Sequence, residues 1–255
     1  MLSSYCAFTN DNNVKIMLPT HEFSNTFAGR DECEFLFRRI NTYLINSGVI
    51  KNNIIDLGAW IGDNSIPWAK NISGIVYAID PSDRNCNFIR EVCALNEIKN
   101  VNVIQTAISD KVEILHTDDW LDHCSFVYGS PGTHSHFHIN ATTLDTLYSE
   151  NMIDNIGYIH LDVEGMERRV LEGASNIIKN FKPIITFEQH LEIDDYKATS
   201  EFVRNNGYEV YLINEVMPHC RHDCRNFIAF PTEIITSALI DEIQASVGRI
   251  LQLQI

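Results

Sequence analysis

The chain has 255 residues, 45% of them hydrophobic, which is enough for one large α/β core with extensions at its ends. Its 34 acidic and 19 basic side chains give a formal net charge of −15, and because no basic run gathers locally, the composition argues against binding to nucleic acid. The apolar runs stay shorter than the ~18 residues of a membrane span, and the N-terminus lacks the charged start and apolar core of a signal peptide, so we expect a cytoplasmic protein bound to no membrane.

Residues 1–50 are predicted to form an N-terminal extension. The run Val14–Leu18, ended by Pro19, is typical of a strand. From Asp31 to about Gly48 the apolar side chains recur at helical spacing. We expect this helix to cover the edge of the sheet or to dock on a partner, which includes a second copy of the chain in a homodimer.

The stretch Asn53–Gly62, N-I-I-D-L-G-A-W-I-G, predicts a buried strand that runs into a tight turn. Gly58 and Gly62 bracket Ala59, Trp60 and Ile61, and polar residues that cap helix N-termini follow at 63–65. A strand, a glycine turn and a helix N-terminus together form a nucleotide-type pocket in α/β proteins.

Two glycines of a dinucleotide-binding turn are replaced in this chain, and these replacements indicate which ligand the turn can hold. The fingerprint Gly-x-Gly-x-x-Gly would need glycines at Trp60 and Asp63, so a pyrophosphate fits badly. S-adenosylmethionine suits the turn better, because backbone N–H groups beside Gly58 can hold its carboxylate and Asp56 can balance its ammonium. The next strand ends at Asp80, 22 residues after Gly58, and this carboxylate can accept both ribose hydroxyls.

Strands and helices alternate through residues 51–232, which we expect to form the core. Further strands are predicted at Ile75–Asp80, Val101–Thr106, Tyr158–Asp162, Ile184–Glu188, Tyr208–Ile213 and Phe227–Phe230, and helices at Ser82–Asn96, Met166–Asn180 and Asp195–Asn206. This alternation predicts a mostly parallel sheet with helices on both faces. A C-terminal helix is expected within residues 233–255.

The segment Ser109–Asn140 interrupts the alternation and is too long to be a simple connection. It carries His134, His136 and His138 in a Gly- and Ser-rich stretch. Alternate histidines of this kind allow either a metal site or a mobile lid over the acceptor, and we expect the lid, over residues 125–140.

The seven cysteines form no regular framework, so we expect free thiols. Cys220 and Cys224, with His219 and His222, do have the spacing of metal ligands, H-C-x-H-x-C. A structural zinc site usually draws on two well-separated ligand pairs, however, and we therefore expect no metal.

The order and spacing of several motifs resemble those of the FkbM-type S-adenosylmethionine-dependent methyltransferases, over about residues 54–190. The motifs are Asp56-Leu-Gly-Ala-Trp-Ile-Gly-Asp63, Val76-Tyr-Ala-Ile-Asp-Pro81, Thr143-Leu-Asp145, Leu161-Asp-Val-Glu-Gly165, Glu167 with Val170-Leu-Glu-Gly-Ala174, and Pro183-Ile-Ile-Thr-Phe-Glu188 with His190. The resemblance implies a class I methyltransferase fold with a Rossmann-like, mostly parallel seven-stranded sheet, and it implies O-methylation. It does not name the acceptor, which we expect to be a small molecule or a glycan.

The chain departs from this family pattern at one position. Where these proteins commonly have Lys-Ile-Asp-x-Glu-Gly, this chain has His160-Leu-Asp-Val-Glu-Gly165. By strand alternation His160 projects on the same side as Asp162. It either replaces a lysine that contacts the substrate or lies buried beneath the cofactor.

The carboxyl ends of parallel strands meet at one rim, where α/β proteins bind their ligands. We expect the cofactor site to comprise Asp56, Gly58, Ala59, Trp60, Gly62, Asp80, Pro81, Ser82, Ala107 and Asp162. Glu188 and His190 share one strand end and one side-chain parity, so we predict that they form the catalytic base. Glu164 is predicted to orient the acceptor, and His160 is the reserve candidate.

Each of these assignments has a structural alternative. The segment Asp162–Glu164 also fits a strand end that caps the following helix, Glu188 and His190 also fit an exposed pair, and Trp60 also fits simple packing under an adenosine. Two other functions stay open on the sequence: a non-catalytic interaction module with this fold, and an NAD-dependent oxidoreductase.

Overall fold

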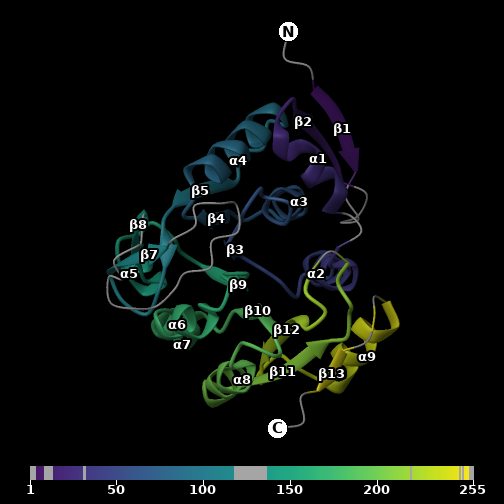
Figure 1. The fold of residues 1–255 in the computed structure, drawn as a ribbon. Helices are drawn as coiled ribbons and strands as arrows, with labels where there is room; N and C mark the ends of the chain where they lie inside the picture. The colour runs from purple at the N-terminus through teal and green to yellow at the C-terminus, as the bar shows by residue number, and fades with distance from the viewer. Residues whose placement is uncertain are drawn as a thin grey trace.

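The computed structural model describes residues 4–8, 14–30, 33–117, 137–218, 220–246, 248 and 250–252. Its main sheet has eight strands in the order β13-β11-β12-β10-β9-β3-β4-β5 (Figure 1). The strands are β3 (Asn53–Leu57), β4 (Val76–Asp80), β5 (Val101–Gln105), β9 (Ile156–Leu161), β10 (Ile184–His190), β11 (Tyr208–Ile213), β12 (Cys224–Pro231) and β13 (Ile250–Gln252). The five strands from β5 to β10 are parallel, whereas β12 runs antiparallel between β10 and β11. The predicted seven-stranded, mostly parallel sheet is therefore confirmed, with β13 added at its edge.

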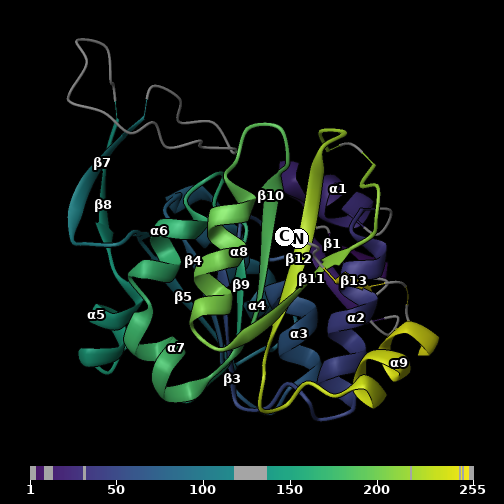
Figure 2. The ribbon, with the colours of Figure 1, turned by 90° about the horizontal axis from the view of Figure 1, so that it is seen from below.

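Helices cover both faces of the sheet, as Figures 1 and 2 show. One face carries α2 (Phe35–Asn46), α3 (Ser65–Asn71), α4 (Asp83–Leu95) and α9 (Ser237–Ser246), and the other carries α5 (Leu144–Ser149), α6 (Glu167–Glu172), α7 (Ser175–Phe181) and α8 (Tyr196–Asn205). Neighbouring residues of one strand enter different cores: Ile54 packs with α2 and α3, whereas Ile55 packs with α5 to α8. Burial on both faces explains why these strands are continuous apolar runs in the sequence. None of the helices described here is long and apolar enough to cross a membrane.

The N-terminal extension packs on the chain's own core. Strands β1 (Ser4–Phe8) and β2 (Lys15–Pro19) form an antiparallel hairpin, followed by α1 (Glu22–Gly29), which the sequence did not predict. Ile16 and Leu18 of β2 are fully buried in one cluster with Phe88 of α4. The predicted helix is present as α2, and its apolar side chains pack on the sheet, so it covers this chain's core as the first of its two expected roles.

A small sheet with the order β6-β8-β7 interrupts the alternation where the long connection was expected. It consists of β6 (Ala107–Ile108), β7 (Glu113–Thr117) and β8 (Phe137–Thr142). Within it, Nδ1 of His138 lies 2.8 Å from Nδ1 of His116. His134 and His136 lie outside the described residues, as does the predicted lid except for its last four positions, which belong to β8.

The structure differs from the prediction in one helix and at the C-terminal end. The single helix expected over residues 166–180 is divided into α6 and α7 around Gly173. The break has a local cause, because the carboxylate of Asp145 accepts hydrogen bonds from the N–H groups of Asn176 and Ile177 and so caps a new helix. The C-terminal segment holds not only the predicted helix, as α9, but also the edge strand β13, a run too short to be read from the sequence.

Candidate active site

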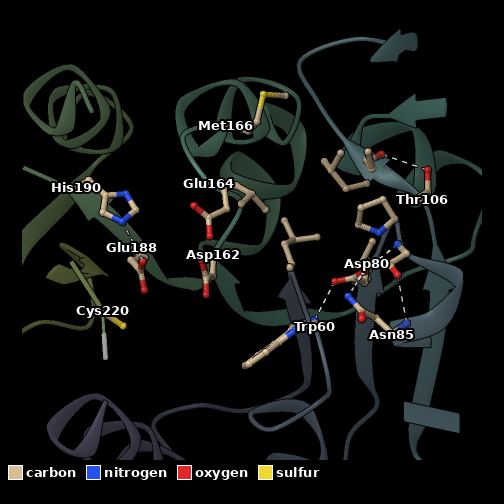
Figure 3. Close-up of a pocket in the computed structure, with 18 of the residues that line it drawn as sticks. Trp60, Asp80, Asn85, Thr106, Asp162, Glu164, Met166, Glu188, His190 and Cys220 are labelled. Atoms are coloured by element: carbon tan, nitrogen blue, oxygen red, sulfur yellow. Dashed lines mark hydrogen bonds and ion pairs between the residues drawn. The ribbon is translucent and has the colours of Figure 1, made fainter. Parts of the chain in front are cut away.

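A pocket of about 280 Å³ opens beyond the carboxyl ends of the parallel strands (Figure 3). Among the residues that line it are most of those predicted for the site: Gly58, Trp60, Asp80, Pro81, Ser82, Ala107, Asp162, Glu164, Glu188 and His190. Asp80 and Asn85 lie at one end, Glu188, His190 and Cys220 lie at the other, and Asp162 and Glu164 lie between them. As expected for ligand sites at the carboxyl ends of parallel strands, residues from most of the chain meet in one cavity.

The glycine turn after β3 requires backbone conformations that side chains disfavour. Gly58 and Gly62 have φ of 73° and 75°, and Trp60 between them has φ of 45°. A Cβ built at Gly58 would lie 1.8 Å from the carbonyl oxygen of Asp162. The sequence analysis explained this glycine by a ligand carboxylate, whereas in the structure it is required because the backbone at the end of β9 passes directly beside it.

Gly58→Ala should therefore destabilise the fold even without ligand. Gly48 is a matched control, because its φ is 71° and an added Cβ would meet nothing within 4 Å. We expect Gly48→Ala to lower the free energy of unfolding by about 1–2 kcal/mol, from the left-handed conformation alone, and Gly58→Ala to lower it by roughly 3–4 kcal/mol. Equal losses in urea titrations would show that the Asp162 carbonyl does not constrain this position.

Asp80 is the centre of one end of the pocket. Its Oδ2 accepts a hydrogen bond from the Trp60 N–H at 2.9 Å, and its Oδ1 accepts from the Ser82 N–H at 2.8 Å and the Asn85 amide at 3.1 Å. A carboxylate offers about four acceptor positions, so one is left, on Oδ2. The amide oxygen of Asn85 has no hydrogen-bond partner in the described part of the chain. Among the described contacts Asp80 therefore keeps one open acceptor position, whereas its sequence position predicted a carboxylate that accepts both ribose hydroxyls, and the Asn85 oxygen is buried.

Four predicted site residues, Asp56, Ala59, Gly62 and His160, do not line the pocket. Asp56 and His160 lie beneath it and are each 1% exposed. The carboxylate of Asp56 accepts hydrogen bonds from the Ser65 hydroxyl and, at 2.7 Å, from Nδ1 of His160. Asp56 is therefore not placed to balance a ligand's ammonium, and the reserve catalytic role of His160 is replaced by a structural one.

The surroundings of His160 explain this correction. Its ring packs against those of Phe37 and Trp68, with centroids 5.0 and 5.5 Å away. Burial alone would lower the pKa of His160, but the hydrogen bond and charge of Asp56 outweigh it, and the pKa is raised. The pair stabilises the core between the sheet and helices α2 and α3, which is the buried alternative that the sequence left open.

Carboxylates crowd the centre and the far end of the pocket. Burial, together with the charges of Glu164 and Glu34, raises the pKa of Asp162 to about 7. Burial and the nearby Asp162 also raise the pKa of Glu188 above its ordinary value. Glu164 has φ of 52°, so a second residue of the pocket besides Trp60 adopts a strained backbone conformation.

Glu188 and His190 lie side by side at the far end. Oε1 of Glu188 is 3.9 Å from Nε2 of His190, and each side chain is about one-seventh exposed, at 13% and 14%. The other ring nitrogen of His190, Nδ1, lies 3.4 Å from Oδ2 of Asp194, which also accepts a hydrogen bond from the His190 backbone N–H at 2.6 Å. Asp194 thus fixes the orientation of the imidazole.

Several lining residues were not predicted from the sequence, and the polar or ionisable ones among them are Arg30, Asn85, Thr106, Cys220 and Arg221. The guanidinium of Arg30 lies 5.4 Å from the centroid of the Trp60 ring and donates hydrogen bonds to Asp63 and to Glu34, at 2.8 and 2.7 Å. The i,i+4 spacing of Arg30 and Glu34 was visible in the sequence. The sequence did not show that Arg30 lies beside Trp60, in the glycine turn 30 residues further along the chain.

The strand order, with antiparallel β12 between β10 and β11, the glycine turn after β3 and the acid at the end of β4 define a class I methyltransferase fold. Residues 56–210 match the Methyltransferase FkbM domain, and the chain belongs to this family.

The solved structures reported next are similar to this chain but distant in sequence. The methyltransferase FkbM from Methylobacillus flagellatus KT is 17% identical with a TM-score of 0.52, over 70% of this chain and 43% of that one, so this chain spans less than half of that protein's length. The precorrin-6y C5,15-methyltransferase from Geobacter metallireducens GS-15 is 13% identical with a TM-score of 0.46, over 74% of this chain and 85% of that one. TYW2 from M. jannaschii, in complex with AdoMet, is 13% identical with a TM-score of 0.41, over 90% and 85%. No curated protein matches the sequence.

Proposed function

We propose that this chain binds S-adenosylmethionine and transfers its methyl group to a hydroxyl of a small-molecule or glycan acceptor. The observation that carries the proposal is the division of one pocket into a hydroxyl-accepting end at Asp80 and an acid–base end at Glu188 and His190. Membership of the FkbM methyltransferase family supports the reaction class.

The residues at the Asp80 end fit the cofactor. The acceptor position left on Oδ2 of Asp80 suits a ribose hydroxyl, and the Asn85 amide holds the carboxylate in place by donating to Oδ1. The pocket wall also carries the carboxylates of Asp162 and Glu164, which complement a cationic ligand. When bound there, S-adenosylmethionine supplies an electrophilic methyl group.

The residues at the other end fit a hydroxylated acceptor. An alcohol is a poor nucleophile while protonated, and a base within hydrogen-bond reach accelerates its reaction by about 10²–10⁴-fold. The 3.9 Å between Oε1 of Glu188 and Nε2 of His190 supports a role for both on one hydroxyl, and Asp194 lies beside the other ring nitrogen of His190, at 3.4 Å. We propose that Glu164, between the two ends, hydrogen-bonds a second acceptor hydroxyl and so positions the first.

Transfer of label from S-adenosylmethionine with a radioactive methyl group to a panel of sugars, polyols and phenols tests this function. The proposal predicts labelled product and S-adenosylhomocysteine in equal amounts with at least one hydroxylated acceptor. Binding of S-adenosylmethionine without turnover on any member would favour the non-catalytic module, and binding of NAD instead would favour the oxidoreductase.

Cofactor affinity should depend on pH through Asp80. Burial raises the pKa of this carboxyl to about 6. The ribose hydroxyl needs an unprotonated acceptor, so affinity is full above this pKa and is lost as the pH falls through it. We expect binding at about pH 5 to be at least roughly tenfold weaker than at pH 7 in calorimetry, and this slope to be reduced in Asp80→Asn to the part that comes from Asp162, whose pKa is about 7. The same slope in that variant would assign the pH dependence to another group.

A further inference from the structure

The antiparallel pairing of β10 with β12 brings three different ligand types together at the acceptor end of the pocket. His190 and Cys224 are direct partners in this pairing, and Glu188 lies two residues before His190 on the same face. One donor atom from each of Glu188, His190 and Cys224 lies within 4.8 Å of the other two. Oε1 of Glu188 lies 3.9 Å from Nε2 of His190.

These spacings suit a tetrahedral metal ion. Zinc–ligand bonds of about 2.0–2.3 Å at tetrahedral angles set neighbouring ligand atoms about 3.3–3.8 Å apart. Side-chain rotations that move each donor atom by less than about 1 Å would therefore bring all three within bonding distance of one ion. A thiolate with an imidazole and a carboxylate selects zinc over magnesium or calcium, which prefer oxygen ligands alone.

The surroundings of two of these donors match those of metal ligands. Nδ1 of His190 faces the carboxylate of Asp194 at 3.4 Å, which leaves Nε2 for an ion and gives the carboxylate–histidine arrangement common beside zinc. Cys224 is 1% exposed, and its thiol contacts that of Cys220, which in turn lies 3.8 Å from the sulfur of Cys33. The thiol of Cys220 can therefore donate a hydrogen bond to a thiolate at Cys224.

We propose that Glu188, His190 and Cys224 bind a zinc ion whose fourth position opens into the pocket. Three protein ligands with one open position are typical of catalytic zinc, and Glu188 and His190 line the pocket on that side. The bound ion would lower the pKa of an acceptor hydroxyl, in place of the free pair acting as base. The site goes beyond the proposed methyl transfer, since the ion binds whether or not an acceptor is present.

The ligand set differs from the one weighed in the sequence. There, Cys220 and Cys224 were grouped with His219 and His222, and a second, distant ligand pair was missing. In the structure β10 supplies that pair as Glu188 and His190. His222 instead bonds Glu192 at 2.9 Å and is 78% exposed, and His219 lies outside the described residues.

Titration of the chelator-stripped full chain with Co²⁺, followed by its visible absorption, tests the site. We expect one equivalent to bind with a thiolate–cobalt charge-transfer band that Zn²⁺ abolishes. Cys224→Ser should remove the band, and His190→Ala should weaken binding by more than about 100-fold, whereas Asp194→Asn should weaken it by only about 10–100-fold. Circular dichroism identifies any variant that fails to fold, in which case Glu188→Gln, expected to weaken binding like His190→Ala, takes its place.

Two matched controls locate the ion. Cys6→Ser removes an exposed thiol far from the pocket, and His222→Gln removes the histidine of the neighbouring Glu192–Asp223 cluster. Both variants should bind one equivalent with unchanged affinity. Absence of the charge-transfer band in the wild type, or loss of binding in His222→Gln with retention in Cys224→Ser, would overturn the proposal. S-adenosylmethionine binding to the metal-free chain, measured in parallel, shows whether the cofactor site stands independently.

Discussion

Replacing Asp80 by alanine should weaken S-adenosylmethionine binding by roughly 100-fold or more. The variant loses a charge-assisted hydrogen bond to the ribose, worth about 1.5–3 kcal/mol. It also removes the carboxylate that accepts hydrogen bonds from the N–H groups of Trp60 and Ser82. Because these groups shape the turn that faces the cofactor, the loss should exceed that of a single contact. Isothermal calorimetry measures it directly.

The control for this variant is Asp83→Ala. Asp83 lies in the first turn of α4, is exposed and bonds only Asn87 among the contacts seen in the described part of the chain. It should bind the cofactor with wild-type affinity. Asn85→Leu, which removes the amide that donates to Oδ1 of Asp80, should lose about tenfold. If Asp80→Ala binds as tightly as Asp83→Ala, the ribose does not lie at this end of the pocket.

Glu188→Gln and His190→Ala should each lower turnover by at least about tenfold, and by up to roughly 10²–10⁴-fold, while cofactor affinity stays unchanged. Both side chains lie at the end of the pocket away from Asp80, so we expect them to affect the acceptor and not the ribose (Figure 3). Rates with saturating S-adenosylmethionine and an acceptor found in the labelling screen measure the effect. His222→Gln, outside the pocket, should keep the wild-type rate.

The same variants distinguish a metal-free Glu188–His190 pair that acts as a base from a pair that binds zinc. If the pair acts as a base, both substitutions lower the rate of the chelator-treated chain. If zinc activates the acceptor, the chelator-treated wild type is already slow and the substitutions add little. Wild-type rates in both variants, with and without zinc and across roughly pH 6–9, would place the base elsewhere.

Much of the fold follows from local signals. The apolar runs at β3, β4, β9 and β10 are buried on both faces, and each is followed by a turn and a helical pattern, so their order predicts the parallel sheet. Because ligands gather at the carboxyl ends of such strands, Asp80, Asp162 and Glu188 could be placed in one pocket from their positions alone.

The errors come from contacts that no local pattern records. Asp56 was placed in the site by its position at a strand end, but its partner is His160 on the neighbouring strand, which turns the carboxylate into the core. Arg30 lines the pocket from the N-terminal extension, the sulfur of Cys33 lies 3.8 Å from that of Cys220, and Cys224 pairs with His190 through the antiparallel strand β12. Edge strand β13 and the small β6-β8-β7 sheet depend on their pairing partners in the same way.

Binding of S-adenosylmethionine to the purified chain tests the central claim most directly. A ligand present at about 100 times its dissociation constant adds about 2.7 kcal/mol to stability, which a thermal-unfolding scan detects readily. We predict stabilisation by S-adenosylmethionine and by S-adenosylhomocysteine, none by NAD, and loss of the effect in Asp80→Ala but not in Asp83→Ala. Stabilisation by NAD alone, or by none of the three, would contradict a methyltransferase pocket at the ends of these strands.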